Sequence, residues 1–134
     1  MRFLIALAAM AVAATPALAR NEPGGEGEAR ETAAYRSCLD QAVSTPDMTG
    51  CMAAEYEVQD KALNAAYAKA MDGLNARQKE KLKTAQRAWI AFRDANCRAL
   101  QDEDWGTLSR VTAMSCMVRM TIERTIELED YPPE

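Results

Sequence analysis

The sequence contains no histidine among its 134 residues. This absence excludes Ser-His-Asp and Cys-His catalysis, because both arrangements need an imidazole base. It also removes the commonest transition-metal ligand. No sequence motif sets a pair of carboxylates around a cleft or supplies an activated nucleophile. We therefore expect a protein that is not an enzyme and that holds no metal and no cofactor.

The sequence also lacks an excess of positive charge. It has 16 lysines and arginines against 20 aspartates and glutamates, which gives a net charge of −4. Nucleic-acid binding needs clustered cations that displace counterions from phosphates, so this balance argues against nucleic acid as a partner. A mildly acidic protein is suited to a basic partner.

Long hydrophobic runs are missing except at the start of the chain. Arg2 is followed by an apolar run over 3–14, a helix break at Thr15-Pro16, and the small-x-small sequence Ala17-Leu18-Ala19. The run is shorter than the roughly 20 residues that a membrane span needs, which disfavours an anchor. The pattern predicts a signal peptide over 1–19 that is cleaved after Ala19. We expect a periplasmic or secreted protein with no membrane span after cleavage.

The segment that follows the predicted cleavage site is rich in Pro, Gly and Glu, as NEPGGEGE over 21–28 shows. Such a composition cannot bury a core, so we expect a disordered leader over 20–28. The folded domain is then expected over 29–134, a length that is enough for one hydrophobic core.

Helical patterns fill this domain, and no alternating strand pattern of useful length is present. A short helix is expected over about 29–42. Longer helices are expected from Thr45, from Asn75 and from Thr107 or Ser109, and end near residues 73, 101 and 130. Thr45 can cap a helix whose first residue is Pro46. Asn75 can cap the next helix, and Gln78 follows three residues later, which is the spacing of a capping box. These patterns predict an all-α, up-and-down bundle of three main helices plus a short N-terminal helix.

The apolar positions of the three long helices predict which side chains face the core. The first two stripes are Met48, Met52, Tyr56, Leu63, Tyr67, Ala70 and Leu74, and then Leu82, Ala85, Trp89, Phe92 and Leu100. The last stripe is Val111, Met114, Val118, Thr121 or Ile122, Thr125 and Leu128. Trp89 and Phe92 are interpreted as core residues, because large aromatic side chains dominate helical cores.

Four cysteines, an even number, lie in the expected domain: Cys38, Cys51, Cys97 and Cys116. In an oxidising compartment they predict two disulfides. No two of them have the C-x-x-C spacing of a zinc knuckle, which disfavours a zinc site. Of the three possible pairings we favour Cys38–Cys51 and Cys97–Cys116, because each pair then flanks a turn between consecutive helices.

The stretch from Cys51 to Leu128 resembles the LprI-like lysozyme-inhibitor domain family. The resemblance rests on D-x-x-L-N-x-x-Y over 60–67, on A-Q-R-A-W-I-x-F-R-D-A-x-C over 85–97, and on Cys116, Thr121, Arg124 and Leu128. The family usually has a Gly-Gly-Ser/Thr turn between its third and fourth cysteines, whereas Trp105-Gly106-Thr107 keeps one glycine here. The resemblance implies a helical extracytoplasmic domain and, for some members, inhibition of lysozyme.

Two hypotheses for function follow. The first is a binding protein that inhibits lysozyme-type glycosidases by occluding their cleft, with a basic protein such as lysozyme as the partner. The alternative is a structural or stress-linked envelope module that binds another envelope protein without inhibiting lysozyme. A direct inhibition assay separates the two.

The family motif contains polar and aromatic residues that are interpreted as structural. We expect an interhelical network in which Arg93 pairs with a carboxylate such as Asp60 or Glu55, because buried polar groups must be paired. The other interpretation makes the polar residues a recognition surface. The set comprises Asp60, Asn64, Tyr67, Gln86, Trp89, Arg93, Asp94 and Arg124.

The turn before the last helix carries Asp102, Glu103, Asp104 and Trp105. It is either a solvated hydrophilic loop or the contact to a basic partner. In the second case the acids steer association and Trp105 acts as an aromatic anchor.

Overall fold

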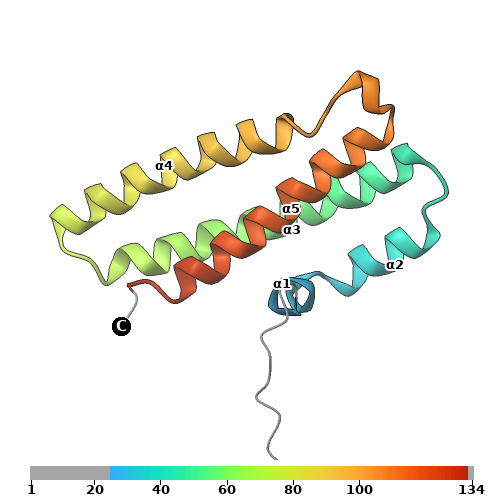
Figure 1. The fold of residues 1–134 in the computed structure, drawn as a ribbon. Helices are drawn as coiled ribbons and strands as arrows, with labels where there is room; N and C mark the ends of the chain where they lie inside the picture. The colour runs from blue at the N-terminus through green and yellow to red at the C-terminus, as the bar shows by residue number, and fades with distance from the viewer. Residues whose placement is uncertain (1–24, 133–134) are drawn as a thin grey trace, which may run out of the picture.

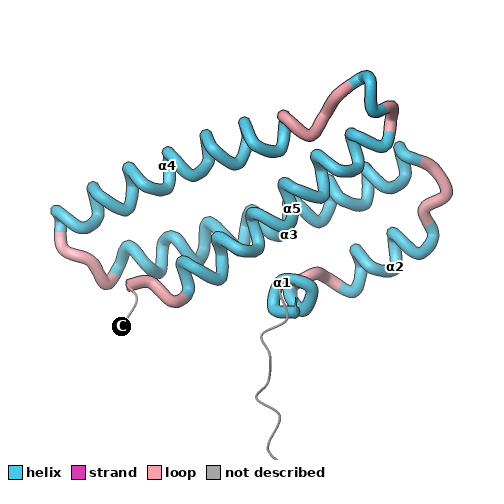
Figure 2. Tube along the Cα trace, in the orientation of Figure 1, coloured by secondary structure: helices cyan, strands magenta, loops and turns pink. Residues whose placement is uncertain are grey.

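A computed structural model describes residues 25–132, so the predicted signal peptide and residues 20–24 lie outside the described part of the chain. Every regular element within 25–132 is a helix (Figures 1 and 2). The elements are α1 (Gly25–Arg30), α2 (Ala33–Gln41), α3 (Thr45–Asp72), α4 (Ala76–Arg98), the 3₁₀ turn η1 (Glu103–Trp105) and α5 (Leu108–Glu129). The all-helical class expected from the sequence is therefore confirmed.

Helices α3 and α5 lie side by side over most of their lengths and form the centre of the molecule (Figure 1). Helix α2 packs against α3 on one side, and α4 packs against α5 on the other. Although α3 and α4 are joined by a tight turn, their backbones approach each other at few points. The three long helices are therefore held together mainly through α5.

Side-chain caps fix where the long helices begin. Asn75 accepts from the Gln78 backbone N–H at 3.0 Å, and Gln78 Oε1 accepts from the Asn75 N–H at 3.0 Å. This is the capping box expected at the start of α4. Helix α3 begins at Thr45, and its cap is Ser44 rather than the expected Thr45. The Ser44 hydroxyl accepts from the Asp47 N–H at 3.3 Å.

The N-terminal region differs from the single helix expected over 29–42. The chain breaks at Thr32, whose hydroxyl caps α2 by accepting from the Tyr35 N–H at 3.0 Å. The same hydroxyl donates to Glu55 Oε2 of α3 at 2.6 Å, and the Thr32 N–H donates to Glu55 Oε1 at 3.0 Å. These bonds to a distant helix stabilise the break, which local sequence cannot reveal. Upstream of it, α1 begins at Gly25, inside the segment expected to be a disordered leader.

The buried apolar side chains form three clusters. One gathers Leu63, Ala66, Ala70, Leu74, Leu82 and Leu128 around the α3–α4 turn. A second joins α2, α3 and α5 through Tyr35, Cys51, Met52, Val118 and Ile122. The third, between α4 and α5, consists of Cys97, Cys116 and Met120. The α3 and α5 stripes predicted from the sequence supply most of the first two clusters.

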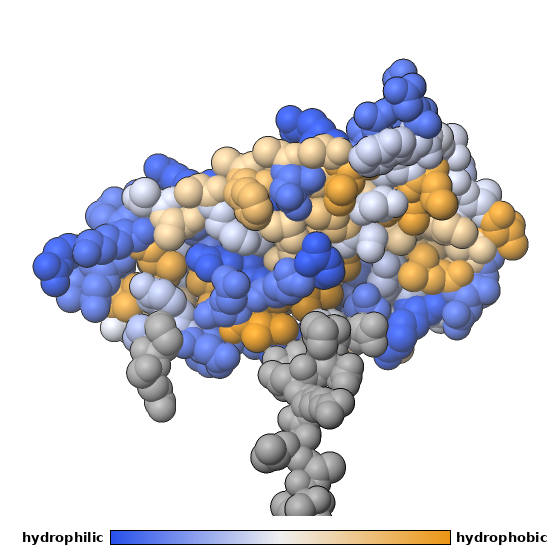
Figure 3. Space-filling view, viewed as in Figure 1, coloured by the Kyte–Doolittle hydropathy of each residue, from blue (hydrophilic) through white to orange (hydrophobic). Residues whose placement is uncertain are grey.

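Helix α4 is rotated relative to its predicted stripe. Its buried residues are Leu82, Gln86, Arg93 and Cys97. Ala85 is exposed, and Phe92 is 59% exposed, so the assignment of these two residues to the core was wrong. Cys97 must face its disulfide partner on α5, and this fixes the rotation of the helix. Figure 3 shows a band of apolar surface over α4.

Both predicted disulfides are present. Cys38–Cys51 joins α2 to α3 with a Cα–Cα distance of 5.7 Å, and Cys97–Cys116 joins α4 to α5 at 5.5 Å. Each bridge closes a short loop and should stabilise the fold by about 2–4 kcal/mol. Each also fixes the two helices that flank one turn.

Candidate partner-binding surface

Arg93 is the most buried cation of the described chain, at 5% exposure. Its Nε and Nη2 donate to Asp94 Oδ1 at 3.0 and 2.8 Å, and its Nη1 donates to Thr121 Oγ1 of α5 at 3.3 Å. The carboxylate that pairs with it is thus the neighbouring one in sequence. The expected pairing with Asp60 or Glu55 was wrong.

The two expected partners are engaged elsewhere. Glu55 accepts from Thr32 and from Gln59 Nε2, the latter at 2.7 Å. Asp60 accepts from Asn64 Nδ2 at 3.0 Å within α3. Both carboxylates therefore have partners near their own position, and Arg93 bonds to Asp94 and to Thr121 of α5.

Aromatic rings complete the environment of Arg93. Its guanidinium lies 5.4 Å from the Tyr56 ring centroid and 5.1 Å from that of Trp89. Arg124 of α5 approaches Trp89 at 5.9 Å and donates from Nε to Gln86 Oε1 at 2.9 Å. Burial raises the pKa of the Tyr56 phenol, and nearby Arg93 opposes this rise. Cation–π contacts of this kind are strongest where the cation is desolvated.

The polar motif therefore divides into two groups. Gln86, Trp89, Arg93, Asp94 and Arg124 hold α4 to α5, as an interhelical network would. The other three, Asp60, Asn64 and Tyr67, line an open groove between α3 and α4 of about 570 Å³. Asn64 donates only within its own helix, to the Asp60 backbone oxygen and carboxylate. Of this second group, only Tyr67 packs against a core cluster shared with α4 and α5.

The acidic turn expected to contact a partner lies at one end of the bundle. Asp102, Glu103, Asp104 and Trp105 are all exposed, Trp105 by 63%. Asp102 Oδ1 accepts from the Asp104 N–H at 2.8 Å and so caps η1. Figure 3 shows the turn as a hydrophilic projection at the upper right, where Figure 1 places the α4–α5 connection.

The base of this turn is held in place from several sides. Gly106 has φ +71°, a conformation that other residues adopt only with strain. The Ser109 hydroxyl, which is buried, donates to the Gly106 carbonyl at 2.7 Å. The Cys97–Cys116 disulfide joins the two helices that enter and leave the turn. Trp105 is thus presented on a braced backbone.

Further exposed apolar side chains, not predicted from the sequence, lie at this end of the bundle. Val43, in the α2–α3 turn, is 91% exposed, and Leu108 at the start of α5 is 61% exposed. The beginnings of α3 and α5 meet where Thr45 Oγ1 lies 3.5 Å from Thr107 Oγ1. The exposure of Val43 could have been predicted from the sequence, because it is an apolar β-branched residue in a polar turn.

Comparison with known proteins gives a family and two relatives. The family model described as "Lysozyme inhibitor LprI" matches residues 27–128. An uncharacterized protein of Rhizobium meliloti is 31% identical over 104 residues, which cover 67% of this chain and 75% of the relative. The uncharacterized protein YecT of Escherichia coli is 34% identical over 97 residues, which cover 60% of each chain. No solved structure matches.

Proposed function

Because the chain belongs to the LprI lysozyme inhibitor family, we propose that it is an extracytoplasmic binding protein that inhibits a lysozyme-type glycosidase by occluding its cleft. The turn from Asp102 to Trp105 makes the main contact. Secretion is proposed with it, on the signal-like sequence of residues 1–19 and on the two disulfides.

One observation carries the proposal, namely an exposed tryptophan beside three exposed carboxylates on a projecting turn. Interface hot spots are enriched in tryptophan, and a projecting element suits a concave target. The cleft of a lysozyme-type enzyme is such a target, since it takes a sugar chain between two catalytic carboxyl groups. The bracing of the turn lowers the conformational entropy that would be lost on binding.

The charges of the turn set the rate of association. Lysozyme is a cationic protein, so three carboxylates on one projection would steer encounters with it. Added salt should slow association more than it speeds dissociation, because exposed charges are screened over about 8–10 Å at physiological ionic strength.

The first experiment replaces the acids by their amides. The triple variant Asp102→Asn, Glu103→Gln, Asp104→Asn should lower the rate of association with lysozyme and flatten its salt dependence. The amide introduced at position 102 retains an oxygen that can cap η1, so the turn should keep its shape. The matched control is Glu57→Gln, Asp72→Asn, Asp130→Asn, which removes the same charge from exposed positions elsewhere. If the two triple variants behave alike, net charge and not the turn governs association.

The second experiment removes the aromatic anchor. Trp105→Ala should raise the dissociation rate by roughly one to two orders of magnitude, in the range of a hot-spot residue. Phe92→Ala is its control, because Phe92 is an aromatic side chain of similar exposure on the outer face of α4. If the parent protein inhibits lysozyme and the Trp105→Ala variant inhibits it equally well, the main contact lies on another surface. If the purified protein does not inhibit any lysozyme, the alternative hypothesis of an envelope interaction module is favoured.

A further inference from the structure

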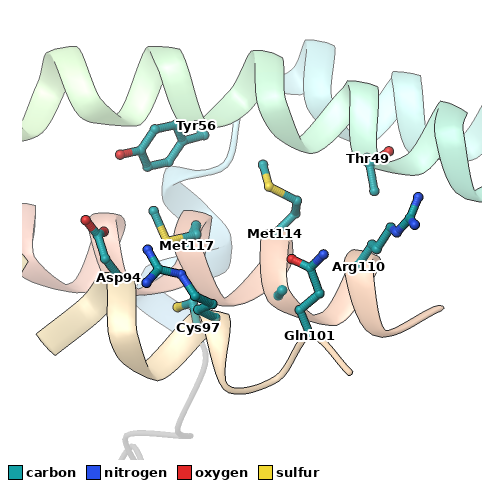
Figure 4. Close-up of a pocket in the computed structure, with 10 residues that line it drawn as sticks. Thr49, Tyr56, Asp94, Cys97, Gln101, Arg110, Met114 and Met117 are labelled. Carbon is teal, nitrogen blue, oxygen red and sulfur yellow. The ribbon is translucent and has the colours of Figure 1, made fainter. Parts of the chain in front are cut away.

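A second hollow lies between α3, α4 and α5, behind the braced turn (Figure 4). Its volume is about 480 Å³, within the range of small-molecule sites. Tyr56 of α3 lies on one side, Asp94 and Cys97 of α4 on another, and Met114 and Met117 of α5 between them. The cavity exists because α4 packs on α5 while its backbone stays away from α3.

The floor of this hollow is apolar and adaptable. Met114 and Met117 are half-buried, and the Cys97 sulfur belongs to a disulfide that is almost completely buried. Methionine side chains are flexible and polarizable, so they adjust to ligands of different shape. Such a floor suits the hydrocarbon part of a small molecule.

The rim is positively charged. Arg98 and Arg110 both line the hollow and are exposed. Neither Arg98 nor Arg110 belongs to any of the five ion pairs among the described residues. Their side chains also donate no hydrogen bond within the described structure, unlike those of Arg93 and Arg124. The hollow's own carboxylate, Asp94, is already paired with Arg93. The two arginines are therefore free to take an anion.

A neighbouring hollow shares these arginines. It lies toward the acidic turn, has a volume of about 550 Å³ and is lined by Asp102 and Glu103 as well as by Arg98 and Arg110. No carboxylate of the described turn comes within 4.0 Å of either guanidinium, the distance of an ion pair. The acids moderate the positive potential of the rim without neutralising either side chain directly.

We propose that this hollow binds a small amphiphilic anion, with a carboxylate or phosphate head on Arg98 or Arg110 and a hydrocarbon segment on Met114 and Met117. Guanidinium groups bind both heads through paired N–H donors. The apolar floor adds affinity that a free inorganic anion would not gain. The rim of this site adjoins the proposed contact with lysozyme, but the binding proposed here does not depend on that contact.

The experiment titrates the purified protein with octanoate and octyl phosphate below their micelle concentrations, and follows binding by calorimetry and by amide NMR shifts. Acetate and inorganic phosphate present the head alone, and octyl glucoside presents the tail with a neutral head. At least one of the two octyl anions should bind with shifts at residues 98, 110, 114 and 117. Acetate, phosphate and octyl glucoside should each bind at least tenfold more weakly.

Variants connect the binding to the rim. At least one of the variants Arg98→Gln and Arg110→Gln should weaken binding of the octyl anion about tenfold, a typical effect of losing one charge-assisted hydrogen bond. Both side chains are exposed, so thermal unfolding should be unchanged. Arg77→Gln is the matched control, since Arg77 is an exposed arginine of α4 that does not line the hollow.

Three results would overturn the proposal. The first is equal binding of octyl glucoside and the octyl anions. The second is unchanged binding in both rim variants. The third is binding only to vesicles of phosphatidylglycerol and phosphatidylcholine, with no binding of the monomeric octyl anions, which would indicate attraction to a membrane surface. Lysozyme inhibition is measured separately, so neither proposal depends on the other's outcome.

Discussion

The two faces of α5 are built from different chemistry. The face toward α2 and α3 is apolar, with Val118 and Ile122 each 2% exposed. The face toward α4 presents Thr121 to Arg93 and Arg124 to Gln86 and Trp89, with the Cys97–Cys116 disulfide at one end. Apolar burial is strong but non-directional, whereas hydrogen bonds require a particular alignment of the two helices. Helix α5 thus forms the main hydrophobic interface with one face and, with the other, a hydrogen-bonded interface that fixes the alignment of α4.

This difference explains the two hollows beside α4. Side chains of the α3–α5 interface fill the space between those helices, as close packing of protein interiors requires. Helix α4 is held to α5 by a few specific contacts and remains away from α3, which leaves a hollow on each side of Arg93. These two hollows therefore lie beside the polar interface. The following predictions test this contrast, beginning with the largest effect.

Removing apolar volume from the α3–α5 interface should be the most damaging change. Ile122→Ala deletes a side chain that is 2% exposed in the cluster with Tyr35, Met52 and Val118. We expect a loss of about 3–4 kcal/mol in the free energy of unfolding, measured by urea denaturation. Leu108→Ala on the same helix should change it by less than about 0.5 kcal/mol, since Leu108 is exposed. Similar losses for both variants would contradict the assignment of this face as the main core.

Trp89→Ala tests the aromatic part of the polar interface. Trp89 is half-buried, packs on two core clusters and contacts two guanidinium groups. We expect a loss of about 2–3 kcal/mol in the free energy of unfolding, below the range for a fully buried tryptophan because part of the ring is exposed. Trp89→Phe should recover more than half of it by retaining an aromatic face. A negligible effect of Trp89→Ala would show that the Trp89 ring contributes little to the contact between α4 and α5.

The Arg93–Asp94 pair should respond asymmetrically. The Arg93 side chain is 6% exposed and that of Asp94 is 41% exposed. Asp94→Ala leaves a buried guanidinium without its carboxylate, whereas Arg93→Met leaves a carboxylate that water can still reach. We expect losses in unfolding free energy of about 2–3 kcal/mol for Asp94→Ala and about 1–2 kcal/mol for Arg93→Met. Equal losses, or the reverse order, would show that the aromatic rings and not Asp94 stabilise the cation.

The smallest effect is expected at the surface contact between α1 and α5. Arg30 donates to both Glu129 oxygens, at 3.0 and 2.6 Å, and this hydrogen bonding lowers the pKa of Glu129. Because the folded pKa is lowered, the contribution is complete above the ordinary glutamate pKa and is lost as the pH falls through the folded pKa. Both side chains are more than one-third exposed, so solvent limits the contribution to a few tenths of a kcal/mol.

The measurement is the free energy of unfolding of the parent and of Glu129→Gln as a function of pH. The two curves should be separated at neutral pH and converge below the folded pKa of Glu129. Glu123→Gln serves as the control, because Glu123 pairs with Arg119 within α5 and does not involve α1. Curves that stay parallel down to acidic pH would mean that the Arg30–Glu129 contact does not contribute in solution.

Local sequence signals predicted most of the fold. Capping residues and proline placed the ends of the long helices, as the Asn75–Gln78 capping box shows. The cysteines flank turns between consecutive helices, which predicted both disulfides correctly. The exposure of the acids and of Trp105 in the η1 turn also followed from sequence, because three consecutive acidic residues close to a glycine cannot join a core. Each of these features depends on neighbours within a few helical turns.

Only the tertiary structure decided how α4 is rotated and what Arg93 contacts. Helix α4 is rich in alanine on several sides, so its hydrophobic periodicity allowed Ala85 and Phe92 to be placed inward. The disulfide to Cys116 turns the adjacent positions Gln86 and Arg93 inward, and Arg93 pairs with Asp94 rather than with Asp60. The hollow bounded by Arg98, Arg110 and the two methionines likewise depends on how α4 packs on α5. A helical repeat specifies which residues share a face, but long-range contacts determine which face is buried.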